Sequence, residues 1–290
     1  MRIDAHQHFW RLARGDYGWL TPELAAIHRD FLPGDLAPHL DACGIDRTVL
    51  VQAAETVDET RWLLGLADAE PRVAGVVGWV DLAAADARAT VDELAAHPRL
   101  VGLRPMLQDI GETDWVLGEA VLDALGHVAA KGLAFDALIQ PRHLATIDEL
   151  ARRVPSLRIV VDHVAKPRIV PGHPPDAEWL AGMDRLAAHP QVHCKLSGMA
   201  NECGAGWTAE DLAPYAAAVL ERFGAERLLW GSDWPVLELV GTYEDWHEAA
   251  LGFACGLDES GRAALFGGNA ARFYRLDGTP DGAARAGFVY

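Results

Sequence analysis

The stretch Ile3–Phe9 reads Ile-Asp-Ala-His-Gln-His-Phe and places two histidines one residue apart near the start of the chain. Side chains of a β-strand alternate between faces, so His6 and His8 point to one side and Gln7 to the other. Two imidazoles on one face can ligate a metal, polarise a carbonyl group or exchange protons near neutral pH. The alternative is a pair of buried histidines that hydrogen-bond to backbone groups, and the His-x-His pattern alone does not decide between the two.

The composition indicates a soluble globular protein. Of the 290 residues, 50% are hydrophobic and 23% are charged, which allows a large core. The chain has 25 Lys and Arg against 42 Asp and Glu, and the resulting net charge of −17 disfavours nucleic acid and anionic membranes as partners. The 4 cysteines form no Cys-x-x-Cys pair, and neither a signal peptide nor a membrane-spanning run is visible. We therefore expect a reduced, cytoplasmic protein.

Short apolar runs, each followed by a helical pattern, recur along the chain. They cover residues 3–9, 47–52, 73–80, 100–105, 133–139, 158–163, 192–198 and 227–234. Strands that alternate with helices are typical of a parallel sheet, and this number of units in a chain of this length predicts a (β/α)8 TIM barrel. A doubly wound open sheet would need a glycine-rich turn after the first strand, where this chain has His-Gln-His. We predict that residues 1–276 form the barrel and residues 277–290 a C-terminal tail.

Polar residues stand at or just beyond the ends of most of these runs. In a barrel the C-terminal ends of the strands meet at one mouth, so these side chains are expected to lie together. Each alone has a structural explanation, such as an ion pair for Arg104 or a helix cap for Asp162. Together they indicate a site for a small, oxygen-rich substrate. The candidates are His6, His8, Gln52, Arg104, Gln140, Asp162, His163, Lys195 and Asp233.

Asp233 belongs to the segment Gly231–Pro235, which reads Gly-Ser-Asp-Trp-Pro and ends the eighth run. The glycine lets the backbone turn, and the tryptophan can exclude water. An aspartate beside histidines in such a mouth can accept a proton from an attacking water. Asp233 is therefore the predicted general base. The alternative is that it caps the helix or loop after the strand.

Several short motifs together resemble the amidohydrolase superfamily. They are Asp4–His8, Val51–Ala54, Gly102–Arg104, Ile139–Arg142, Asp162–Pro167, Cys194–Gly198 and Gly231–Pro235. Within the superfamily the chain resembles the amidohydrolase-related branch that includes sugar lactonases such as L-fuconolactone and L-rhamnonolactone hydrolases. The resemblance implies a metal-type barrel in which His6, His8, His163 and Asp233 are ligands or catalytic groups.

One departure from the superfamily pattern bears on the metal. Metal-dependent members usually supply a histidine or a carboxylated lysine from the fourth or fifth strand, whereas here those strands lead to Arg104 and Gln140. The lactonase branch also includes members that need no metal. We therefore expect either no cofactor or one zinc ion at a mononuclear site. The ligands of that ion would be His6, His8, His163 and Asp233.

The hypothesis that follows is hydrolysis of a small sugar lactone, of the fucono-, rhamnono- or galactonolactone kind, to its aldonic acid. Asp233 would activate the water. The carbonyl group would be polarised, and the oxyanion stabilised, by His6, His8, His163 and Lys195. The sugar would be bound by Trp19, Gln52, Arg104, Gln140 and Trp234.

Two other functions stay open on the sequence alone. A zinc-dependent decarboxylase or amidase on the same barrel would need a firm metal site. A non-catalytic barrel that binds sugar acids would be expected to have lost its proton-transfer residues, which this chain retains. The sequence also leaves open the identity of the lactone, its ring size and the oligomeric state, a homodimer included.

Overall fold

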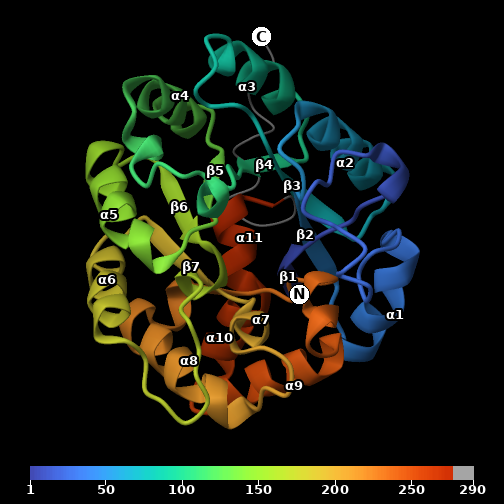
Figure 1. Ribbon diagram of the computed structural model, residues 1–290, viewed down its shortest axis with the longest axis vertical. Coiled ribbons are helices and arrows are strands. Elements are labelled where there is room, and N and C mark those ends of the chain that lie inside the picture. The colour runs from blue at the N-terminus through green and yellow to red at the C-terminus, as the bar shows by residue number, and fades with distance from the viewer. Residues whose placement is uncertain (277–290) are drawn as a thin grey trace.

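In the computed structural model, which describes residues 1–276, eight parallel strands form a nearly closed barrel surrounded by helices (Figure 1). The strands lie in the sheet in the order of the sequence, each paired with the next. They are β1 (Ile3–Gln7), β2 (Arg47–Val51), β3 (Val73–Gly78), β4 (Leu100–Leu103), β5 (Ala134–Ala137), β6 (Arg158–Val161), β7 (Val192–Leu196) and β8 (Leu228–Trp230). The prediction of a (β/α)8 barrel is confirmed.

Helices connect the strands, and most of them cover the outside of the barrel (Figure 1). They are α1 (Pro33–Cys43), α2 (Val57–Ala69), α3 (Ala87–Ala95), α4 (Glu119–Ala130), α5 (Leu144–Arg153), α6 (Ala177–Ala187), α7 (Met199–Cys203), α8 (Ala209–Phe223), α9 (Tyr243–Phe253), α10 (Glu259–Ala263) and α11 (Asn269–Tyr274). Several begin at a polar side chain that accepts a hydrogen bond from a free backbone N–H of the first turn, as Thr56 does for α2 and Asp176 for α6.

The apolar core has two parts. The larger part lies between the strands and the surrounding helices. The smaller part fills the inside of the barrel, where Ile3, Ala5 and Val49 pack against Phe273 and Tyr274 of α11. Figure 1 shows α11 within the ring of strands. This helix closes the end of the barrel opposite the polar strand ends and leaves that mouth as the place for a site.

The barrel closes where the segment after β8 runs beside β1. Asp233 N–H donates to His6 O and His8 N–H donates to Trp234 O, both at 2.8 Å. The eighth strand, Leu228–Trp230, is shorter than the predicted run of residues 227–234, and Asp233, which has a positive φ of 60°, joins β1 from the segment after the strand. Closure therefore rests on these loop hydrogen bonds.

The buried carboxylate of Asp4 reinforces this closure. Its oxygens accept hydrogen bonds from Ser232 N (2.9 Å), His6 N (3.1 Å) and the Tyr243 hydroxyl (3.0 Å). Burial raises the pKa of Asp4 to about 6, although these donors oppose the shift. Asp4 thus ties together β1, the segment after β8 and α9.

Within residues 1–276, no helix is both long enough and apolar enough to cross a membrane. The predicted C-terminal tail, residues 277–290, lies outside the described residues, and the boundary between barrel and tail stays a prediction.

Replacing Tyr243 with phenylalanine removes one of the donors to Asp4. We expect Tyr243→Phe to lower the free energy of unfolding by about 2 kcal/mol, because hydrogen bonds to charged groups contribute about 1.5–3 kcal/mol. Tyr215→Phe is the matched control, since its hydroxyl donates to the neutral carbonyl oxygen of Arg168 at 3.2 Å and should cost about 1 kcal/mol. Urea denaturation at pH 8, where Asp4 is ionised, measures both values. Equal losses would contradict the role given to Asp4.

Candidate active site

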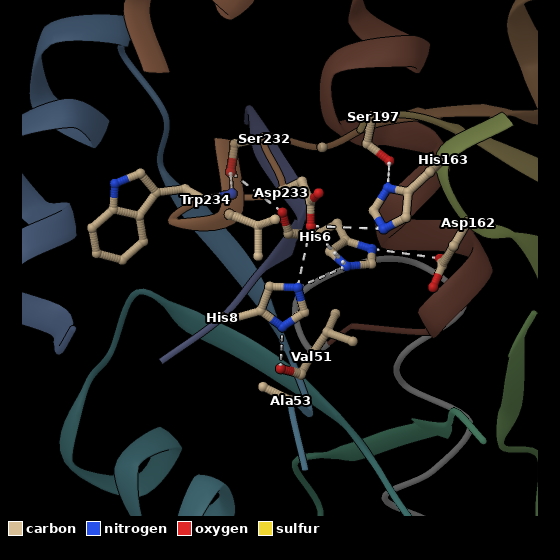
Figure 2. Close-up of polar contacts among 12 residues, drawn as sticks. His6, His8, Val51, Ala53, Asp162, His163, Ser197, Ser232, Asp233 and Trp234 are labelled. Atoms are coloured by element: carbon tan, nitrogen blue, oxygen red, sulfur yellow. Dashed lines mark hydrogen bonds and ion pairs between the residues drawn. The ribbon is translucent and has the colours of Figure 1, made fainter. Parts of the chain in front are cut away.

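Three histidines and one aspartate converge at the C-terminal ends of β1, β6 and β8 (Figure 2). Asp233 Oδ1 lies 3.2 Å from His8 Nε2, 3.6 Å from His6 Nε2 and 3.7 Å from His163 Nε2. The two histidines of the first strand touch each other, with 3.1 Å between their Nε2 atoms. All four side chains are buried, so their polar atoms face one another instead of bulk water.

Close packing against glycine positions two of these rings. A Cβ on Gly231 would lie 2.7 Å from His6 Cβ, and a Cβ on Gly198 would lie 2.6 Å from His163 Cγ and Nδ1. Gly198 also has a φ of +65°, which favours glycine. His163 itself begins a run of positive φ values that extends to Lys166. Such backbone is sparsely populated by residues with a Cβ and is typical of functional sites.

Hydrogen bonds on the far side of two rings orient their Nε2 atoms toward Asp233. His8 Nδ1 lies 2.8 Å from the carbonyl oxygen of Val51, which can only accept, so Nδ1 carries a proton. In a neutral imidazole this leaves the lone pair on Nε2. His163 Nδ1 contacts the Ser197 hydroxyl at 2.9 Å. Figure 2 shows both contacts, with the rings turned toward the aspartate.

Charged side chains lie beneath the histidines, inside the barrel. The Lys195 ammonium is 2.6 Å from Asp136 Oδ2, 3.0 Å from Asp162 Oδ1 and 3.0 Å from His6 Nδ1. Arg104 Nη1 lies 3.3 Å from Asp162 Oδ2, and Nη2 donates to the carbonyl oxygen of Gln52 at 2.5 Å. Two cations and two carboxylates therefore neutralise one another in this layer, as buried charges require.

These surroundings shift the pKa values of the converging groups. Burial opposes the charge of Asp233, but His163, His8 and His6 hold the pKa of this carboxyl well below its usual range. Burial lowers the pKa of His163 to about 4. Burial and the Lys195 ammonium lower the pKa of His6 well below the usual value. At neutral pH the site therefore holds the Asp233 carboxylate beside the neutral imidazoles of His6 and His163.

A cavity of about 310 Å³ opens over this cluster. Its floor includes His8, His163 and Asp233, and its wall includes Trp19 and Arg104. A larger cavity of about 680 Å³ lies between the segment before α8 and helix α9, and none of the predicted site residues lines it. We assign the site to the smaller cavity because the titratable groups converge there.

The predicted site residues do not all reach the cavity. His6, Lys195, Gln52 and Trp234 are fully buried and do not line it. Gln52 donates to the backbone oxygen of Arg104 at 2.7 Å, so it supports that arginine from behind. Trp234 packs to the side of the site, against Phe9 and Phe31 (Figure 2).

Gln140 lies farther out than predicted. It is exposed and contacts Arg142, 3.3 Å away, outside the cavity lining. The reason is that β5 ends at Ala137, so the chain has already left the barrel mouth at this residue.

Sequence reasoning missed several residues of the cavity wall. The polar ones are Gln108, Asp109 and Lys166, and Lys166 Nζ donates to Gln108 Oε1 at 2.8 Å. The apolar ones are Leu24, Met106, Leu138, Val236 and Leu239. Lys166 lies in the segment Asp162–Pro167 and had a signal there, but the apolar residues come from loops whose paths no pattern predicts.

The donor atoms fit one zinc ion. Ligand atoms of a tetrahedral site stand about 3.3 Å apart, because Zn–N distances are about 2.0–2.1 Å. The separations from Asp233 Oδ1 to the imidazole Nε2 atoms are 3.2, 3.6 and 3.7 Å. His6, His8 and Asp233 form one group with metal-ligand spacing, and His6, Asp162 and His163 form another. The zinc ligand set His6, His8, His163 and Asp233 stays a prediction.

An amidohydrolase family profile matches residues 3–276 of the chain. The chain belongs to the amidohydrolase family. The prediction of an enzyme of this superfamily is thereby confirmed.

Similar amidohydrolases include two proteins of known activity. An L-fucono-1,5-lactonase of Burkholderia ambifaria is 48% identical over 282 residues, which cover 95% of this chain and 96% of the relative. An L-fucono-1,5-lactonase of Burkholderia multivorans is 37% identical, with 95% and 96% coverage. A crystal structure of a B. multivorans amidohydrolase with bound zinc is 36% identical, with a TM-score of 0.88 and coverage of 95% of this chain and 99% of that one.

Gly198→Ala tests the packing of His163. Both Gly198 and Gly206 have positive φ, but a Cβ on Gly206 would meet nothing within 4 Å. We expect Gly206→Ala to cost about 1 kcal/mol of unfolding free energy through backbone strain alone. Gly198→Ala should cost at least about 2 kcal/mol, because His163 must also move. Urea denaturation and the NMR signals of the histidine side chains measure the two effects, and an unmoved His163 in Gly198→Ala would refute this packing.

Proposed function

We propose that the chain hydrolyses a small 6-deoxy sugar 1,5-lactone to its aldonic acid. The observation that carries the proposal is the group of three imidazoles and a carboxylate under a cavity with both polar and apolar walls. The similarity to the two L-fucono-1,5-lactonases supports the substrate class. The proposed reaction type rests on this similarity and on the group of imidazoles and carboxylate together.

Asp233 is the general base of the proposed reaction. As a carboxylate beside His8 and His163, it accepts a proton from water while the water oxygen attacks the lactone carbonyl carbon. When the bond between the carbonyl carbon and the ring oxygen breaks, Asp233 returns the proton to that oxygen. The low pKa of Asp233 favours this return to a strongly basic alkoxide.

Groups that line the cavity stabilise the charge that develops on the carbonyl oxygen. Arg104 is a permanent cation held by Asp162 and by the backbone oxygen of Gln52, so it needs no reorganisation during the reaction. His163 faces the same space. Lys195, which the sequence placed in this role, lies below the cavity lining and acts through His6 instead.

A zinc ion bound by His6, His8, His163 and Asp233 would act as a Lewis acid on the carbonyl oxygen or on water. The contribution of the chain is to present these donors from three different strand ends, with Gly198 and Gly231 packed against two of the rings.

The walls of the cavity favour a sugar with one apolar end. Lys166, Gln108 and Asp109 offer hydrogen-bonding groups for ring hydroxyls, and Trp19 offers an aromatic face. Leu24, Val236 and Leu239 form an apolar wall that suits the methyl group of a 6-deoxy sugar better than a hydroxymethyl group.

Two lactones that differ only at carbon 6 test this specificity. We expect kcat/KM for L-fucono-1,5-lactone to exceed that for L-galactono-1,5-lactone by about 10–100-fold, because an apolar pocket rejects an added hydroxyl only to about this extent. A pH indicator reports acid release, with spontaneous hydrolysis subtracted. Equal values for the two lactones would contradict the apolar contact with the methyl group, and turnover of neither would contradict the proposed reaction.

Asp233→Asn tests the base. Asparagine keeps the size of the side chain but cannot accept the proton, so kcat should fall by about 10²–10⁴-fold with little change in lactone binding. Asp176→Asn is the matched control, because Asp176 caps α6 away from the site and asparagine is an equally good cap. Stopped-flow turnover with both variants measures the difference. Normal turnover by a folded Asp233→Asn protein would assign the base to another group, His163 first.

A further inference from the structure

Lys195 is a fully buried lysine that does not line the cavity. Its ammonium contacts Asp136 Oδ2 at 2.6 Å, Asp162 Oδ1 at 3.0 Å and His6 Nδ1 at 3.0 Å. Asp136 also accepts from the Tyr274 hydroxyl at 2.6 Å. Every close partner of the ammonium is therefore a side chain held in place by the barrel interior.

The donors and acceptors in these contacts determine which ring nitrogen of His6 carries the proton. An ammonium group has three N–H donors and no acceptor, and three polar atoms surround it here. His6 Nδ1 must then be an acceptor, so the single proton of the neutral ring is on Nε2. In the opposite tautomer, an N–H of His6 would point at the ammonium of Lys195 from 3.0 Å.

A second cation competes for the lone pair of the same ring. Arg104 Nη1 lies 3.3 Å from His6 Nε2, and a neutral imidazole has one lone pair to offer. Arg104 has other acceptors, since the same Nη1 lies 3.3 Å from Asp162 Oδ2 and Nη2 donates to the backbone oxygen of Gln52. Lys195 is closer to His6 and has only two carboxylates besides, so the Lys195 contact prevails.

With its proton on Nε2, His6 completes a chain of hydrogen bonds that all run in the same direction. In the neutral ring of His8, Nδ1–H donates to Val51 O and the lone pair is on Nε2, which lies 3.1 Å from His6 Nε2 and 3.2 Å from Asp233 Oδ1. Lys195 thus donates to His6, His6 donates to His8, and His8 donates to Val51 O. The opposite tautomer would place the Nε2 lone pairs of His6 and His8 against each other.

We propose that Lys195 is a positioning residue that holds His6 in the Nε2–H tautomer and thereby weakens the affinity of the site for zinc. A metal can bind His6 through Nε2 only when the proton has moved to Nδ1, where it faces Lys195 and where Asp162 Oδ1, at 3.5 Å, is the remaining acceptor. The tautomer of His6 is a property of the protein without substrate, so it can be tested independently of the substrate.

Nitrogen-15 NMR of the histidine side chains tests the tautomer in the unaltered chain. The whole protein is labelled with [15N]histidine, freed of metal with a chelator, and the His6 signals are assigned by their absence in His6→Gln. We expect two-bond couplings that report a proton on Nε2 of His6. A proton on Nδ1, or on both nitrogens, would overturn the proposal.

A double variant tests the effect on zinc. Lys195→Met combined with Asp136→Asn removes the buried cation together with one of its carboxylate partners, and leaves Asp162 paired with Arg104. We expect His6 to change to the Nδ1–H tautomer and zinc to bind at least tenfold more tightly, as measured by competition with a chromophoric chelator. Asp136→Asn alone is the control and should keep the Nε2–H tautomer.

Unchanged zinc affinity and tautomer in the folded double variant would overturn the proposal. If the double variant does not fold, the tautomer of the unaltered chain still decides the question. Failure of lactone hydrolysis would leave both readouts intact.

Discussion

Two backbone hydrogen bonds between β1 and the segment after β8 determine much of this structure. They join Asp233 N to His6 O and His8 N to Trp234 O, each at 2.8 Å. These bonds close the barrel, and they also place the carboxylate of Asp233 beside the two histidines of the first strand. The buried carboxylate of Asp4 holds the same junction from below. The hydrogen bonds that close the barrel therefore also assemble the site, which explains why the first and last strands carry so much of the chemistry.

Charge is arranged in layers along the barrel axis. Lys195, Arg104, Asp136 and Asp162 neutralise one another under the histidines. Arg104 reaches from this layer to the cavity wall, which also holds Lys166, while the whole chain carries a net charge of −17. A neutral lactone is not repelled by such a surface, whereas an aldonate is. The overall charge therefore favours departure of the proposed anionic product.

The sequence predicted the barrel well because its evidence was repeated: eight apolar runs, each with a helix after it, leave few other topologies. It also predicted which strands bring residues to the mouth. It could not predict how deep in the barrel each side chain lies. Lys195 lies within β7 and not at its end, so its side chain lies in the layer beneath the cavity, and Gln140 lies beyond the end of β5. Trp234 follows Asp233, but its side chain packs against Phe9 and Phe31 and does not line the cavity. Lys166 reaches the wall only through the positive-φ run from His163, and short sequence patterns do not encode such a path.

The lactone is proposed to react in the cavity over His8, His163 and Asp233. A crystal structure of the chain with L-fuconate, the product of the proposed reaction, tests this proposal most directly. We expect the product in this cavity, with its carboxylate beside Asp233 and His163 and its methyl group against Leu24, Val236 and Leu239. L-Fuconate bound instead in the larger cavity beside Trp207 and Phe253, with the smaller cavity empty, would contradict this assignment of the site.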